Sequence, residues 1–329
     1  MSEIALNKPP EAPSSAGAFR RWWQHGDRLY QALLLAAAAL LLALVVAIGY
    51  QLWQTSALSR LQFGWRFLTT TAWDPALNKT FGALPFILGT LITSALALLL
   101  AVPLGMGSAI FLAELAPDWL GRPLSFLAEL LAAVPSVVYG MWGLFAFIPG
   151  LVKPLAQFLA HSAGFIPLFA GPVFGPSRLA AGLVLAIMVF PTITAVSRDV
   201  LRAIPNTQRE ASLALGATRW EMIWQVLLPY GSSGFLGAII LGLGRALGET
   251  IAVTMVIGNN LDLTASLLHP GYTMASVIAN EFTEATFDLY LNALIEIGLI
   301  LFVMTLIINL LARLLLWRMT RSAGGEVRA

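Results

Sequence analysis

Two charged residues stand in an otherwise apolar stretch, and their types suit chemistry on an anion. Arg245 and Glu249 are four positions apart, so in a helix they share one face. An ionised side chain near a bilayer centre costs about 2.5–3.5 kcal/mol on insertion scales, so neither is expected to face lipid. A guanidinium fork matches the oxygens of an oxyanion, and a nearby carboxylate weakens the hold or acts as a gate. The pair predicts either an ion pair that fixes helix packing or a contact for an anionic solute.

Glycines surround this pair, and they predict close helix packing. Gly244 and Gly248 form a Gly-x-x-x-Gly motif, which lets membrane helices approach closely. With Gly242 the run loosely resembles a dinucleotide fingerprint, but the spacing differs and no strand precedes it.

Several kinds of site are excluded by residue type. The chain has no cysteine, and its three histidines are far apart in sequence, so we expect no metal site and no cofactor. None of its three lysines follows a glycine, so the chain lacks the phosphate loop that binds ATP. The net charge of +2 is small and dispersed, which argues against nucleic acid as a partner.

Composition indicates that most of the chain lies in lipid. Of 329 residues, 58% are hydrophobic and 11% are charged, whereas an ordinary soluble domain has about 25% charged residues. A soluble enzyme and a disordered protein are therefore excluded. A membrane helix needs about 20 apolar residues. Six runs meet that length, and we predict an all-α integral membrane protein with spans at about 30–53, 84–113, 124–148, 179–197, 226–257 and 289–316.

The first run is too long for the apolar core of a signal peptide, so we predict a retained membrane helix at 30–53. Basic residues favour the cytoplasmic side. Thirteen lie on the side of the termini and five on the opposite side, so both termini are predicted to be cytoplasmic. The predicted organisation is a partly disordered tail 1–29, the first helix, an outer loop 54–83, a core 84–316 with a cytoplasmic loop 199–225, and a tail 317–329.

Prolines interrupt residues 149–177, so we interpret this segment as lying along the outer surface or re-entering the membrane. Residues 259–288 carry acidic side chains and no lysine or arginine, and we place them outside.

The loop between the fourth and fifth spans carries local folding signals. Thr207-x-x-Glu210 and Thr218-x-x-Glu221 each match a capping box. Gly216 lies between them, where a glycine that ends a helix is expected. The loop is thus predicted to form a short helix, a glycine elbow and a second helix. Such an amphipathic helix serves either as a membrane-surface helix or as a docking site for a cytoplasmic partner.

The same loop resembles the EAA signature of the permease subunits of ATP-binding-cassette importers. The matching residues are Glu210-Ala211-Ser212, Gly216, Val226, Leu228 and Pro229, with serine and valine replacing the signature's alanine and isoleucine. The resemblance implies that this loop is the coupling helix, which fits a cleft on a separate ATPase. Its implied coupling residues are Arg209, Glu210, Ala211, Ser212, Gly216, Ala217 and Thr218.

A closer resemblance is to the PstC family, the permeases of phosphate importers. It rests on residues 242–259 (GLGRALGETIAVTMVIGN), 273–282 (TMASVIANEF) and 101–105 (AVPLG), and it covers roughly 80–316. It implies the MetI-like fold of type I importers in a bacterial inner membrane, with phosphate as the solute and Arg245 and Glu249 on its path. The implied partners are a PstA-like second permease, a PstB-like ATPase dimer that hydrolyses ATP, and a PstS-like phosphate-binding protein.

Three alternatives stay open from the residues. A permease for sulfate, molybdate or another small solute would share the same loop. An ATP-independent channel or secondary transporter would instead have acidic or histidine relays and no docking loop. An integral-membrane enzyme needs a cluster of catalytic groups, and Arg245 with Glu249 is too sparse for one.

Overall fold

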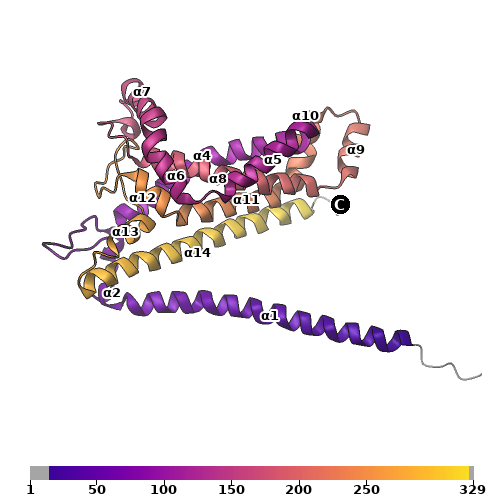
Figure 1. Ribbon diagram of the computed structural model, residues 1–329, viewed down its shortest axis with the longest axis horizontal. Coiled ribbons are helices and arrows are strands. Elements are labelled where there is room, and N and C mark those ends of the chain that lie inside the picture. Colours follow the sequence, from indigo (N-terminus) through magenta and orange to yellow (C-terminus); the bar gives the residue numbers. More distant parts are fainter. Residues whose placement is uncertain (1–14, 326–329) are drawn as a thin grey trace, which may run out of the picture. The chain divides into compact units, whose positions relative to one another are not determined.

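The structure, a computed structural model, describes residues 15–325, and every regular element in that range is a helix (Figure 1). Within the described residues, six helical segments are long and apolar enough to cross a bilayer: Tyr30–Thr55, Leu84–Leu115, Ser136–Ala163, Arg178–Ala203, Arg219–Gly248 and Asp288–Leu314. Helices suit this composition because each satisfies its backbone hydrogen bonds within one segment, which a lipid environment requires. The predicted number of spans is confirmed.

The chain divides into two compact units, Met1–Gln54 and Thr55–Ala329. The first unit contains most of α1, Ser15–Thr55, a single helix of 41 residues. Residues 15–29 of the predicted tail 1–29 are helical, while residues 1–14 lie outside the described range. Likewise α14, Asp288–Gly325, continues through most of the predicted C-terminal tail.

The second unit is built around α8, Arg178–Ala203, which packs along α4, Leu84–Ile110, and α11, Leu228–Gly248. Small residues allow the close approach of α8 to α4. A Cβ added at Gly182 would clash with the Leu96 side chain of α4, so a larger residue there would force that side chain to shift. The buried aliphatic side chains of α8 fill the centre of the core.

The third span begins later than predicted. After α5, Asp118–Ala133, Val134 is extended and Pro135 follows, which divides α5 from the next helix. The span then runs through α6, Ser136–Trp142, the π-helix η2, Gly143–Val152, and α7, Lys153–Ala163. The prediction of a span at 124–148 is wrong in its start and its end.

Residues 149–163, predicted as surface or re-entrant chain, are also part of this span. Pro149 lies inside the π-helix η2, and Pro154 is in the first turn of α7. A π-helical register accommodates a residue whose missing N–H would break an α-helix. The non-helical connection is shorter than predicted, and it contains the 3₁₀ turn η3, Pro167–Phe169.

The fifth span is also interrupted where the sequence predicted a continuous helix to 257. It starts with α10, Arg219–Met222, and the π-helix η4, Ile223–Leu227, and it continues as α11. α11 ends at Gly248, Glu249 is extended with ψ 124°, and α12, Ile251–Ile257, then begins. Arg245 and Glu249 consequently do not share one helical face, so that prediction is wrong.

Different short helices lie at the two ends of the second unit. Figure 1 shows α9, Asn206–Ala214, and α10 at one end, with α7, α12 and α13, Met274–Glu281, at the other. Near the latter end, α2, Ala57–Phe63, packs against α14, and α3, Arg66–Thr69, against α4. Arg178 holds the neighbouring loop in place by donating hydrogen bonds to the carbonyls of Thr264 (2.6 Å) and Asp262 (2.7 Å).

Candidate functional site

The elbow formed by α9 and α10 has a well-defined backbone. Gly216 follows α9 with φ +88°, a left-handed conformation that favours glycine. Thr218 Oγ1 accepts from the Glu221 N–H, and the Glu221 carboxylate accepts from the Thr218 N–H, so both halves of that capping box are present. The box predicted at Thr207 is wrong. α9 already begins at Asn206, and Pro205 precedes it as a cap without a side-chain acceptor.

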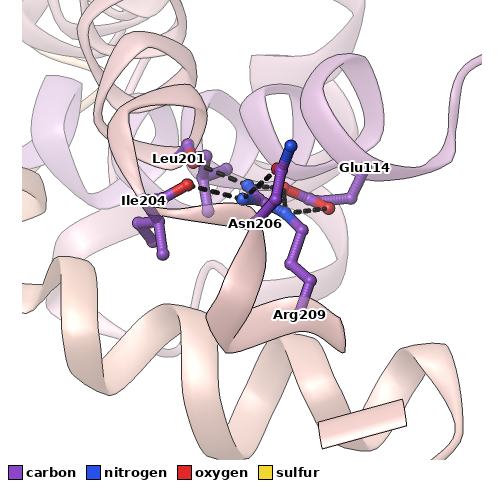
Figure 2. Close-up of polar contacts among 5 residues, drawn as sticks. All are labelled: Glu114, Leu201, Ile204, Asn206 and Arg209. Atoms are coloured by element: carbon purple, nitrogen blue, oxygen red, sulfur yellow. Dashed lines mark hydrogen bonds and ion pairs between the residues drawn. The ribbon is translucent and has the colours of Figure 1, made fainter. Parts of the chain in front are cut away.

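Arg209 lies in this elbow, and its side chain turns back toward the membrane spans (Figure 2). Its Nη2 donates to Glu114 Oε1 and to the Leu201 carbonyl, each at 2.7 Å, and its Nη1 donates to the Ile204 carbonyl at 2.7 Å. Glu114 belongs to the π-helix η1, Phe111–Leu115, at the end of the second span, and its side chain is 8% exposed. One guanidinium thus ties α9 to the adjoining ends of two spans.

Other members of the predicted coupling set are more open to solvent. Glu210, Ala211 and Gly216 are exposed, whereas Ser212 and Ala217 are half-buried. The elbow also presents an apolar tip, since Leu215 is 90% exposed. Sequence reasoning missed Leu215 and also Glu114, the partner of Arg209. Leu215 could have been found from its position directly before the glycine of the elbow.

A second candidate site is a cavity of about 910 Å³ between α8, α11 and α14. It is lined by Thr192, Gly237, Ile240, Leu241, Gly244, Arg245, Leu306, Asn309, Leu310 and Arg313. A Cβ added at Gly237 or Gly244 would meet no atom within 4 Å. These two glycines therefore leave space in the cavity rather than serving a close helix contact.

Arg245 reaches into this cavity from α11. Its Nη1 donates to Thr192 Oγ1 at 3.3 Å and lies 3.5 Å from the Ala132 carbonyl. No ion pair with Glu249 is found in the described range. Glu249 Oε1 instead accepts from the Ala252 N–H at 3.3 Å, at the start of α12. The intrahelical ion pair is thus not formed, and the arginine charge stays available to a ligand.

The opposite end of the second unit carries a half-buried carboxylate. Glu281 Oε2 accepts from Trp73 Nε1 and from the Tyr290 hydroxyl, each at 2.7 Å. Burial raises the pKa of Glu281, and the nearby Glu284 charge raises it further, while the donated hydrogen bonds act in the opposite direction. This cluster joins the loop before the second span to α13 and α14.

Comparison with known proteins decides the family. Residues 101–321 match the model described as "Binding-protein-dependent transport system inner membrane component". Over 320 residues the chain is 45% identical to the "Phosphate transport system permease protein PstC" of Xylella fastidiosa (strain 9a5c), covering 96% of this chain and 98% of the relative. The chain belongs to the PstC family. The PstC protein of Pasteurella multocida (strain Pm70) is 47% identical over 289 residues, 87% of this chain and 88% of the relative.

Solved structures support the fold of this PstC family member. A bacterial alginate ABC transporter, in complex with an alginate pentasaccharide-bound periplasmic protein, matches with TM-score 0.57 at 18% identity. The match covers 89% of this chain and 96% of that chain. A bacterial ABC transporter involved in the import of alginate matches with TM-score 0.53 at 19% identity, covering 91% and 99%. The predicted MetI-like permease fold is confirmed, and the chain is a multi-pass membrane protein.

Proposed function

We propose that this chain is a transmembrane permease subunit of an ATP-driven phosphate importer. The observation that carries the proposal is the 45% identity to a protein named phosphate transport system permease protein PstC across nearly the whole of both chains. The sequence lacks a phosphate loop for ATP, so hydrolysis belongs to another subunit.

The cavity around Arg245 supports an anionic solute. Its lining contains two arginines, one asparagine and one threonine, and it contains no carboxylate. Phosphate presents several acceptor oxygens, which suit a guanidinium. Glu249 lies in the break between α11 and α12 and accepts a hydrogen bond from the Ala252 N–H, so we assign it to the path as a gate element at this break rather than as the partner of Arg245.

The α9–α10 elbow supports coupling to a partner. It presents an exposed apolar tip, Leu215, beside the exposed Glu210 and Ala211. An apolar knob with a polar rim is the usual anatomy of a docking element. We assign the cleft that receives this elbow to one copy of a PstB-like ATPase dimer. Arg209 holds the elbow against the membrane spans of the permease.

The distribution of basic residues supports an orientation in which α9 and both termini are cytoplasmic. A PstA-like permease then supplies the other half of the path within the membrane. A PstS-like phosphate-binding protein docks on the opposite face, where α12, α13 and the loop before the second span lie.

Uptake of labelled phosphate tests this function. Cells that lack their own high-affinity phosphate permease would express this chain with its cognate partners, and unlabelled phosphate, sulfate and molybdate would compete. We expect uptake that needs this chain and that only unlabelled phosphate reduces. Competition by sulfate or molybdate would assign the permease to another oxyanion, and uptake without the ATPase subunit would favour a channel or secondary transporter.

A further inference from the structure

The cavity of Arg245 contains a second cationic residue that belongs to another span. Arg313 and Asn309 are four residues apart on α14, so they share one face of that helix, and both line the cavity. Arg313 is exposed and Asn309 is half-buried. Each side chain offers N–H donors, and the asparagine adds one acceptor.

The two arginines lie toward opposite ends of the cavity. α11 and α14 run in opposite directions in the second unit (Figure 1). On α11 the lining extends from Gly237 to Arg245, and on α14 it extends from Leu306 to Arg313. The Arg313 end of the α14 lining therefore corresponds to the Gly237 end of the α11 lining, and Gly237 is about 12 Å along the axis from Arg245 at 1.5 Å per residue. The later part of α14, which contains Arg313, runs toward the end of the unit that carries α9 (Figure 1).

Neither cation is neutralised by a neighbouring acid. No ion pair of Arg245 or Arg313 occurs in the part of the chain that the structure describes, and no aspartate or glutamate lines the cavity. A cavity with one sign of charge and apolar walls concentrates ions of the opposite sign.

We propose that Arg313 and Asn309 form a second anion-binding position, which receives the anion from Arg245 on its way toward the α9 end. The inference rests on the proposed function and names a further specificity residue for the same path. Two weak positions in series suit transport, because conduction needs binding that is strong enough for entry and weak enough for release. Gly237 keeps the cavity open beside Arg313, since no atom lies within 4 Å of its added Cβ.

A thiol placed beside Arg313 tests the electrostatic part directly. The chain has no cysteine, so Leu310→Cys gives it a single thiol that lines the cavity, three residues from Arg313. The complete complex in vesicles of zwitterionic lipid would be treated in separate reactions with two methanethiosulfonate reagents, an anionic one that carries a sulfonate and a cationic one that carries a trimethylammonium group. Label would be quantified on this chain after separation of the subunits.

We expect the anionic reagent to react faster and inorganic phosphate to slow it. In the Leu310→Cys background, Arg313→Gln is expected to lower the ratio of the anionic to the cationic labelling rate about tenfold. This is the effect of removing a unit charge roughly 6 Å from a singly charged reagent in water, since the change acts on the two reagents in opposite directions. Arg313→Lys is expected to keep the ratio but lose part of the phosphate protection, because its ammonium lacks the guanidinium fork. Arg122→Gln is the matched control, since Arg122 is exposed on α5 outside the cavity.

Several results would overturn the inference. An unchanged rate ratio in Arg313→Gln would remove Arg313 from the anion path. Anionic lipid that abolishes phosphate protection would assign the position to a lipid headgroup instead. Protection by sulfate but not by phosphate would leave the second position in place and refute the proposed solute, so the two claims fail separately.

Discussion

The Arg209 guanidinium lies where α8 ends, and it donates hydrogen bonds to two of the last carbonyls near that end, those of Leu201 and Ile204. The C-terminal carbonyls of a helix lack intrahelical donors and carry partial negative charge, so a cation there is favourable. Glu114 supplies the compensating carboxylate and is itself nearly buried. Arg209, although it belongs to the predicted coupling motif, therefore holds α9 in position against the ends of the spans.

Arg209→Gln is expected to destabilise the complex by about 3 kcal/mol, because it leaves the Glu114 carboxylate buried without its charged partner. Thermal unfolding of the purified complex measures this loss, and phosphate uptake per ATP hydrolysed is expected to fall as well. Removing both charges with Glu114→Gln is expected to recover part of the stability. Arg202→Gln removes an exposed arginine at the end of α8 and is the control. Wild-type stability in Arg209→Gln would contradict the role of the Arg209–Glu114 ion pair in holding α9 against the spans.

The half-buried Glu281 carboxyl predicts that the stability of the folded protein depends on pH. Its pKa is raised in the folded state, so the folded protein binds the proton more tightly than the unfolded chain does. The stability from this group is therefore fully present below the ordinary carboxyl pKa, and it is lost as the pH rises through the raised pKa.

We expect the thermal midpoint of the complex to contain a component that falls with rising pH above about pH 4.3, the ordinary pKa of glutamate. Glu281→Gln is expected to remove that component, since the amide does not titrate. Glu284→Gln removes a nearby exposed carboxylate and is expected to reduce the slope only slightly. A slope in Glu281→Gln equal to that of the wild type would refute the assignment.

Helices and their elbows were predictable where local chemistry decides them. The glycine elbow and the capping box at Thr218 follow from neighbouring residues, and both are formed. The break at Glu249 was not predictable from apolar character, because the helices on both sides of it, α11 and α12, consist mainly of apolar residues and glycine. The third span was misplaced for a related reason, since Pro135 separates helices while Pro149 is absorbed in a π-helix.

The elbow itself is testable at Gly216. Its φ of +88° is unfavourable for a residue with a Cβ, although no atom lies within 4 Å of an added Cβ. Gly216→Ala is therefore expected to cost about 1–2 kcal/mol from backbone strain alone, and Gly216→Asn less, because asparagine tolerates this conformation. Co-purification of the ATPase subunit with the permease measures the effect on docking.

Gly107→Ala is the matched control for the elbow. Gly107 also has open space around its added Cβ, but it lies inside α4 without a positive φ. Alanine is expected to be neutral or mildly stabilising there. Equal loss of docking in both variants, or no loss in Gly216→Ala, would contradict a role of the left-handed turn.

For the whole molecule, composition predicted the membrane class and the six spans, since both depend on apolar length alone. The cavity was not predictable in the same way. Thr192 comes from α8, Arg245 from α11, and Asn309 and Arg313 from α14, so only the packing of these three helices brings the four side chains together. Arg245 was identified because a charge within an apolar run is costly.

The most direct test of the account is ATP-driven phosphate accumulation in vesicles that contain the complete complex with Arg245→Gln. The wild type should accumulate labelled phosphate only with ATP. Uptake by the variant should be roughly 10- to 100-fold lower than that of the wild type, as expected for removal of a charge-assisted hydrogen bond of about 1.5–3 kcal/mol. Its assembly and ATP hydrolysis should remain near the Arg122→Gln control. Normal accumulation in Arg245→Gln would contradict the central claim that the anion crosses through this cavity.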